Sequence, residues 1–132
     1  MNLRKRNLSA AVILLSILLA LMLAGCSQQP KTLADAINSD EEARQTIESL
    51  NSDGLEVAIE ENTVVYTYTY PETYAPEMVE LIKPEAEKML GNQASVFESL
   101  ASTLEEETGI SGIGVRVIYL NGDGSEIIRQ DF

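Results

Sequence analysis

The chain has 132 residues and carries 21 acidic side chains against 9 basic ones, which gives a formal net charge of −12. It holds one cysteine and neither histidine nor tryptophan, so it lacks the groups for histidine-based acid–base catalysis, Ser-His or Cys-His nucleophiles and ordinary zinc sites. The acidity also argues against nucleic acid as a partner, because such binding needs a cationic surface.

The first 25 residues have the composition of a secretory signal peptide. Three basic residues, Arg4 to Arg6, precede an uncharged apolar run from Leu8 to Ala24, which ends in small residues. A retained membrane anchor is the alternative, but the 17 residues of this run are the lower limit for crossing a bilayer, and no basic stop-transfer segment follows. In either case the basic head predicts that the rest of the chain is exported.

The residues Leu23-Ala24-Gly25-Cys26 resemble the lipobox of bacterial lipoproteins in composition, spacing and position. The resemblance implies cleavage between Gly25 and Cys26 and a diacylglycerol on the Cys26 sulfur, which would hold the protein on the outer face of the cytoplasmic membrane. Cleavage would remove three cations, so the formal charge would fall from −12 to −15. The mature chain would then consist of a lipidated cysteine and tether, residues 26–31, and a single domain, residues 32–132.

Helical patterns open this domain. Apolar residues recur at helical spacing from Asp40 to Leu50, and one turn of helix from Thr32 can precede them. Ser39 is the expected N-cap, because Glu42 follows three residues later and completes a capping box. Residues 51–54 have the composition of a turn.

Residues 55–70 carry the strongest strand pattern in the chain. Apolar and polar residues alternate from Leu55 to Glu60, and the residues from Thr63 to Tyr70 are almost all β-branched or aromatic. A two-residue loop at Glu61-Asn62 predicts an antiparallel hairpin with one apolar face and one polar face. The apolar pairs expected in this hairpin are Ile59 with Val64, Val57 with Tyr66 and Leu55 with Tyr68.

A broad apolar stripe at helical spacing, which begins at Met78, predicts helix from Pro76 onward, with Gly109 as its C-cap. Pro84 is expected to kink or restart this helix, and Gly91-Asn92 to bend or break it. Leu81 falls away from the stripe, so we expect it to face away from the core.

Residues 113–132 predict a second hairpin, with strands at 115–120 and 126–132 and a turn of Asn-Gly-Asp-Gly between them. Both strands carry apolar residues on both faces, so the pattern does not assign the face that meets the core. The domain is expected to be α+β, in the order α-ββ-α-ββ, with a four-stranded antiparallel sheet and the helices packed on one face.

The turn from Asn121 to Glu126 places oxygen ligands at alternate positions, as a calcium-binding EF-hand loop does. The pattern then fails, because Glu126 stands where that loop has glycine and Phe132 stands where it has glutamate. A hairpin turn explains the asparagine and the glycines fully. We therefore expect neither a metal site nor a cofactor.

Four of the five tyrosines lie between positions 66 and 74, and on an exposed face they could hold a sugar or a peptide. The hairpin register puts Tyr66 and Tyr68 mostly in the core, so Tyr70 and Tyr74 are the better candidates for exposure. Packing in the core or at its boundary is the favoured interpretation of all four.

Several stretches together resemble a family of small lipoproteins of Gram-positive bacteria that is known only as a domain of unknown function. These stretches are the lipobox, residues 51–54, 56–57, 62–68, 97–100 and 117–124, and Phe132. The resemblance implies a cell-surface lipoprotein, and it supplies no active site.

From the anchor, the acidic domain and the missing catalytic groups, we expect a membrane-anchored extracytoplasmic lipoprotein that is not an enzyme. Its domain is expected to bind a protein or peptide partner in the cell envelope. The alternative is a carrier of a small ligand or a divalent cation that uses Asp123, Glu126 or the tyrosines at the sheet edge.

Overall fold

The computed structural model describes residues 32–51 and 53–132. The expected signal peptide, the cleavage site at Gly25-Cys26, the lipidation site and the tether lie outside the described residues. No helix within the described ranges is long and apolar enough to cross a membrane.

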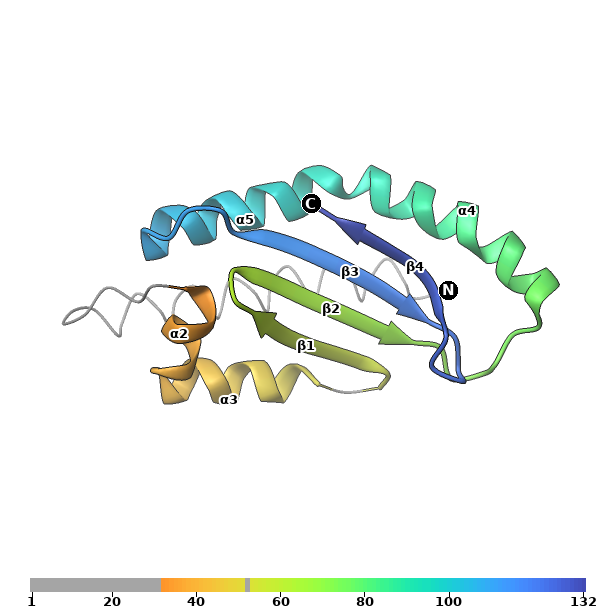
Figure 1. Ribbon diagram of the computed structural model, residues 1–132, viewed down its shortest axis with the longest axis horizontal. Coiled ribbons are helices and arrows are strands. Elements are labelled where there is room, and N and C mark those ends of the chain that lie inside the picture. The colour runs from red at the N-terminus through yellow and green to blue at the C-terminus, as the bar shows by residue number, and fades with distance from the viewer. Residues whose placement is uncertain (1–31, 52) are drawn as a thin grey trace.

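Four helices and one four-stranded sheet make up the described chain (Figure 1). In chain order the elements are α2 (Leu33–Asn38), α3 (Glu41–Leu50), β1 (Leu55–Glu60), β2 (Thr63–Thr69), α4 (Pro76–Asn92), α5 (Ala94–Thr108), β3 (Gly114–Leu120) and β4 (Glu126–Asp131). The prediction of an α+β fold with two hairpins is confirmed. Four helices stand where the expected order had two, because α2 precedes α3 and the long helical segment divides into α4 and α5.

The expected purely antiparallel sheet is wrong. The strand order is β1-β2-β3-β4, and the two hairpins meet through a parallel pairing of β2 with β3. The cause is the connection between the hairpins, in which α4 and α5 lead the chain back along the sheet (Figure 1). Strand β3 therefore begins at the same end of the sheet as β2, as a helical crossover requires of parallel neighbours.

The expected N-cap Ser39 is also wrong. Asp40 begins α3, because its Oδ1 accepts hydrogen bonds from the backbone N–H groups of Glu42 and Ala43 at 3.0 and 3.2 Å. Ser39 instead closes α2, and its hydroxyl donates to the carbonyl of Ala36. A serine followed by an aspartate offers two adjacent caps, and the break between the helices selects the second.

The long helical segment breaks once, one residue after the predicted Gly91-Asn92 interruption. Gln93 leaves the helical conformation with φ −104° and ψ 2°, and α5 then closes on Gly109 with φ +71°, the predicted C-cap. Pro84 lies inside α4, which continues past it to Asn92, so the helix does not restart there. Its ring lies on the exposed side of α4, while Ala86 and Leu90 bury the other side.

The predicted register of the first hairpin is confirmed for Ile59 with Val64, Val57 with Tyr66 and Leu55 with Tyr68. In the second hairpin the alternation of burial along β3 identifies the core face, with Val115, Val117 and Tyr119 turned inward. A bulge next to Tyr119 makes Ile127 the extra residue on β4, so that both Ile127 and Ile128 are buried. This bulge is why apolar residues fall on both faces of that strand.

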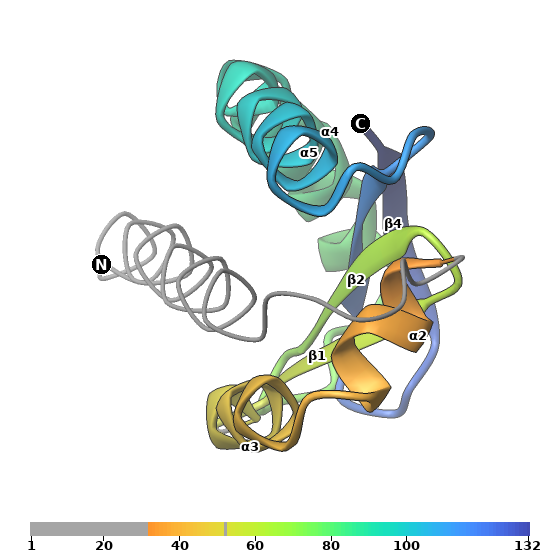
Figure 2. The same ribbon diagram turned by 90° about the vertical axis from the view of Figure 1, so that its left-hand side faces the viewer.

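One core fills the space between the sheet and its helices. Figure 2 shows α3 and the α4–α5 pair on the same side of the sheet, where α3 contacts β1, α4 contacts β4 and α5 contacts β3. The largest fully buried side chains come from five different elements; they are Leu33, Leu90, Leu104, Val64 and Val115.

We expect Leu104→Ala to lower the free energy of unfolding by about 2–5 kcal/mol, because Leu104 is 1% exposed and its truncation leaves a cavity against β3. Val96→Ala on the same helix is the control, because Val96 is 50% exposed, and its effect should stay within about 0.5 kcal/mol. Urea unfolding followed by circular dichroism measures both values. Equal effects of the two substitutions would contradict this description of the core.

Candidate functional site

A buried asparagine organises one end of the sheet. Asn121, directly after β3, is the one polar residue that the described ranges bury, with 4% exposed. Its Oδ1 accepts from the backbone N–H of Tyr74 at 2.8 Å, and its Nδ2 donates to the carbonyl of Tyr74 at 2.9 Å. The side chain thus satisfies both backbone groups of a residue 47 positions away in the chain. The β3–β4 turn is thereby fixed to the connection between β2 and α4.

The backbone of the β3–β4 turn also lies close to the segment that follows β2. The N–H of Tyr70 donates to the carbonyl of Leu120 at 2.9 Å, which continues the parallel pairing beyond β2. A Cβ at Gly122 would lie 2.6 Å from the carbonyl carbon of Glu72 and 2.7 Å from the nitrogen of Thr73. Glycine is therefore required at this position by the approach of another backbone segment.

Four tyrosines pack against one another beside this contact. The ring of Tyr68 meets Tyr70 edge-on at 5.3 Å and Tyr119 edge-on at 5.8 Å, measured between ring centroids. Tyr70 also meets Tyr74 edge-on at 5.4 Å, and it stacks on Tyr119 at 6.2 Å. Tyr70 and Tyr74 are therefore only half-exposed, which agrees with the boundary packing expected of them.

Burial is the main cause of the raised pKa values of two buried tyrosines, Tyr119 and Tyr66. It raises the pKa of Tyr119 to about 12, and the neighbouring Tyr70 and Tyr68 add to the effect. Tyr66 is 5% exposed as predicted, and desolvation raises the pKa of its phenol far above the ordinary value. The Tyr66 hydroxyl is buried and has no hydrogen-bond partner among the described residues, while its ring packs near Phe97 at 6.3 Å.

The side-chain oxygens of Asn121 and Asp123, in the turn that was compared with a calcium-binding loop, accept hydrogen bonds from the protein itself. Asp123 Oδ1 accepts from the backbone N–H of Ser125 at 2.9 Å and from its hydroxyl at 2.6 Å, and these hydrogen bonds lower the pKa of Asp123. Asn121 Oδ1 accepts from two N–H groups, those of Tyr74 and Gly122. Gly124 has φ +89°, the left-handed glycine expected of this hairpin turn. The described ranges hold no group of three acidic, histidine or cysteine side chains that could bind a metal.

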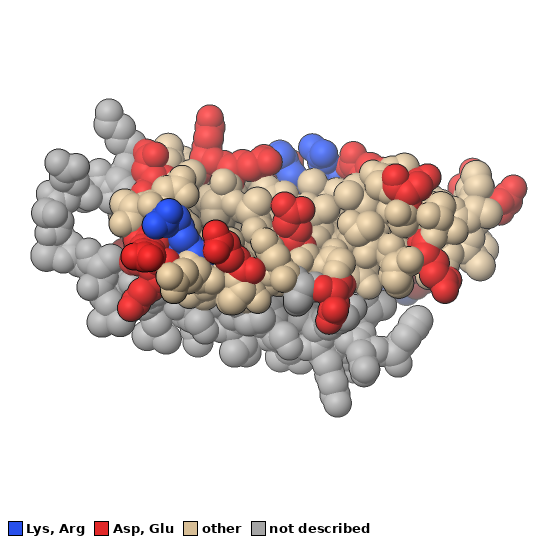
Figure 3. Space-filling view, turned by 90° about the horizontal axis from the view of Figure 1, so that it is seen from below, with Lys and Arg blue, Asp and Glu red and all other residues tan. Residues whose placement is uncertain are grey.

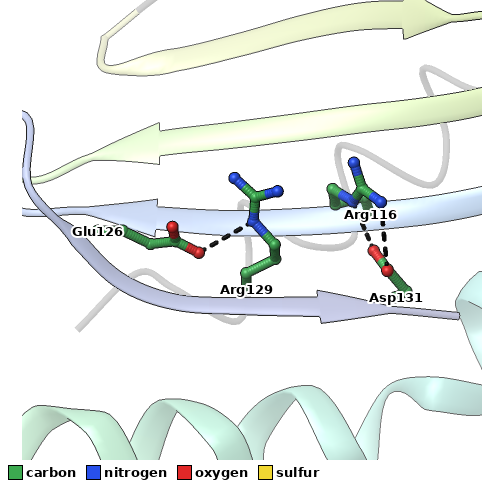
Figure 4. Close-up of polar contacts among 4 residues, drawn as sticks. All are labelled: Arg116, Glu126, Arg129 and Asp131. Carbon is green, nitrogen blue, oxygen red and sulfur yellow. Dashed lines mark hydrogen bonds and ion pairs between the residues drawn. The ribbon is translucent and has the colours of Figure 1, made fainter.

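Ion pairs occupy the outer face of the second hairpin (Figure 4). Arg116 on β3 forms a bidentate pair with Asp131 on β4, at 2.6 and 3.3 Å, and Arg129 pairs with Glu126 at 3.0 Å. Hydrogen bonding to Arg116 lowers the pKa of Asp131. Exposed pairs of this kind contribute little to stability, and they neutralise two of the few cations on the molecule.

Sequence reasoning placed Asn121 in a turn and missed that it fixes a distant loop. An Asn-Gly pair after a strand is the ordinary signal of a hairpin turn, and it gives no sign that the amide faces inward. The arrangement as a whole offers packed aromatic rings and internally bonded oxygens, which suit recognition by contact better than proton transfer.

We expect Asn121→Ala to destabilise the protein by about 2–3 kcal/mol, because it leaves both backbone groups of Tyr74 without their partner in a partly buried place. Asn92→Ala at the exposed end of α4 is the matched control and should change little. Thermal and urea unfolding compare the two variants. A cost for Asn121→Ala no larger than that of the control would contradict the role assigned to this amide.

Tyr66→Phe should leave the protein as stable as the wild type or more stable by about 1 kcal/mol, because it removes a buried hydroxyl without a partner and keeps the ring. Tyr66→Ala, which removes the ring as well, should cost about 3–5 kcal/mol. The same unfolding experiment applies. A clear loss of stability in Tyr66→Phe would mean that the hydroxyl has a partner.

Comparison with known proteins gave one result. A search of the curated proteins and a search of the solved structures each found no match. A family model does match, over residues 33–132, and it is described as a domain of unknown function, DUF4854. The predicted resemblance to a family of unknown function is thus confirmed, whereas its link to Gram-positive lipoproteins stays a prediction. The chain belongs to the DUF4854 family.

Proposed function

We propose that this protein is a membrane-anchored extracytoplasmic lipoprotein, and that its DUF4854 domain is a binding module without enzymatic activity. The anchor rests on the sequence, in which a basic head and an apolar run lead to Leu23-Ala24-Gly25-Cys26. Two acyl chains on Cys26 would hold the protein stably, whereas a single chain binds only marginally.

One observation supports the binding role: at the end of the sheet around Asn121, rigid loops lie beside exposed apolar side chains. Its loops are fixed by hydrogen bonds to Tyr74, yet the helix that follows exposes two large apolar side chains, Met78 and Leu81. A rigid surface with exposed apolar side chains suits contact with a partner. The side chains of Asn121 and Asp123 are hydrogen-bonded within the two loops, which supports binding over catalysis.

The small-ligand alternative has less support. Its carboxylate Asp123 accepts two hydrogen bonds from Ser125, and Glu126 is paired with Arg129. A calcium ion would have to replace these contacts before it could bind.

The anchor is tested by Cys26→Ser in the producing cell, with Ser27→Ala as the matched control. We expect the control to stay in the membrane fraction and to be digested by protease added to intact protoplasts. Cys26→Ser should either leave the membrane or accumulate with its amino-terminal segment uncut, because serine cannot take the lipid.

Chemical cross-linking in the same cells tests the binding role. We expect a discrete adduct with the control protein and a weaker one with any released Cys26→Ser protein. Full membrane retention of Cys26→Ser after cleavage would contradict lipid anchoring, and the lack of any adduct with the control would contradict the binding role.

A further inference from the structure

Two apolar side chains stand out on the first turns of α4. Met78, which the apolar stripe placed toward the core, is 48% exposed, and Leu81 is 67% exposed. The two are three positions apart, so they lie on one side of the helix. Ala75, the N-cap of α4, and Pro76, its first residue, are exposed and lead directly into them. We call this region the entry surface and define it as Glu72, residues 75–81 and Asp123.

Acidic side chains surround this apolar pair. Residues 70–82 and 121–126 contain five carboxylates and neither lysine nor arginine. All five are exposed; they are Glu72, Glu77, Glu80, Asp123 and Glu126. Within the described part of the chain, only Glu126 of these five forms an ion pair, with the side chain of Arg129. Figure 3 shows red acidic side chains at this end of the molecule, which lies on the right there as in Figure 1.

The two loops of the entry surface are held together. Gly122 lies against the backbone of Glu72 and Thr73, and Asn121 bonds both backbone groups of Tyr74. The N–H of Met78 donates to the carbonyl of Ala75 at 2.9 Å, which fixes the first turn of α4. Little conformational entropy is therefore lost when a partner binds here.

The entry surface lies at the opposite end of the sheet from the start of the domain. Leu33 donates its N–H to Asn62 Oδ1 at 3.0 Å, and Ala34 donates its N–H to the carbonyl of Glu61 at 2.8 Å, so α2 begins at the β1–β2 turn. From that turn, β2 runs seven residues to the entry surface, roughly 23 Å at 3.3 Å per residue (Figure 1). A lipid anchor just before residue 32 would therefore leave the entry surface free.

We propose that the entry surface is a docking site for a basic amphipathic segment of a protein partner. The segment presents apolar side chains to Met78 and Leu81, and lysine or arginine to the carboxylates around them. Complementary charge selects the partner and speeds its approach, while the apolar pair supplies the contact that excludes water. This inference rests on the proposed binding role and adds the surface and the chemistry of its partner.

The test uses the purified full chain in a nonionic detergent, with detergent alone as the blank. The probe is a synthetic helical peptide of about 15 residues, with leucine on one face, lysine on the other and one tryptophan. The chain has no tryptophan, so the fluorescence of the peptide reports binding selectively. A second peptide has the same lysines with serine in place of leucine.

We expect the first peptide to bind the wild type at least about tenfold more tightly than the second, and Leu81→Lys to weaken its binding by about tenfold. Met78→Lys should weaken it similarly. Val96→Lys is the matched control, because it adds the same charge at a side chain of similar exposure on α5, outside the entry surface, and should leave binding nearly unchanged.

Three outcomes would overturn the proposal. Equal binding of the two peptides would mean a diffuse electrostatic attraction. If Val96→Lys and Leu81→Lys weakened peptide binding equally, the added positive charge would act through the net charge of the protein and not through the entry surface. Leu81-dependent pelleting of the chain with phosphatidylglycerol vesicles would assign the surface to a membrane. None of these outcomes depends on Cys26, so failure of the anchor is seen separately by cell fractionation.

Discussion

The hydrogen bonds of the Asn121 side chain are the constraint on which the rest of this structure depends. The carboxamide takes the place that a neighbouring strand would have, since it accepts from the N–H of Tyr74 and donates to its carbonyl. The chain leaves the sheet after β2, at Thr69, and returns to it forty-odd residues later, at Gly114, and its two passages meet at this point. The buried amide thereby adds to the parallel pairing of β2 with β3, which joins the two halves of the domain along the sheet.

The parallel pairing of β2 with β3 explains why the aromatic rings gather there. Parallel neighbours end at the same edge of a sheet, so Tyr68 lies beside Tyr119 in the register of the two strands. Tyr70 and Tyr74 follow β2 directly and reach the same cluster. An antiparallel pairing of β2 with β3 would have put Tyr119 at the opposite end from Tyr68. The topology, more than the local sequence, therefore makes this end aromatic.

What could be predicted from the sequence was local, and what could not be predicted depended on distant partners. The register of the first hairpin follows from alternation and a two-residue loop, and the exposure of Leu81 follows from its place off the apolar stripe. Alternation does not encode which strands become neighbours, so the parallel pair was missed. The inward face of β4 was hidden by the extra residue Ile127, and the role of Asn121 was hidden behind an ordinary turn signal.

The distribution of cations gives the acidic composition a structural meaning. Arg116 and Arg129, on the outer face of the second hairpin, are each paired with a carboxylate of their own strand pair. The entry surface holds four carboxylates and no cation of its own, and the nearest cation along α4 is Lys83, so its charge stays negative. Because exposed charges are screened over about 8 Å at physiological salt, this potential acts only on partners that already approach that end. The fixed loops and the exposed Met78 and Leu81 then decide which of those partners stay bound.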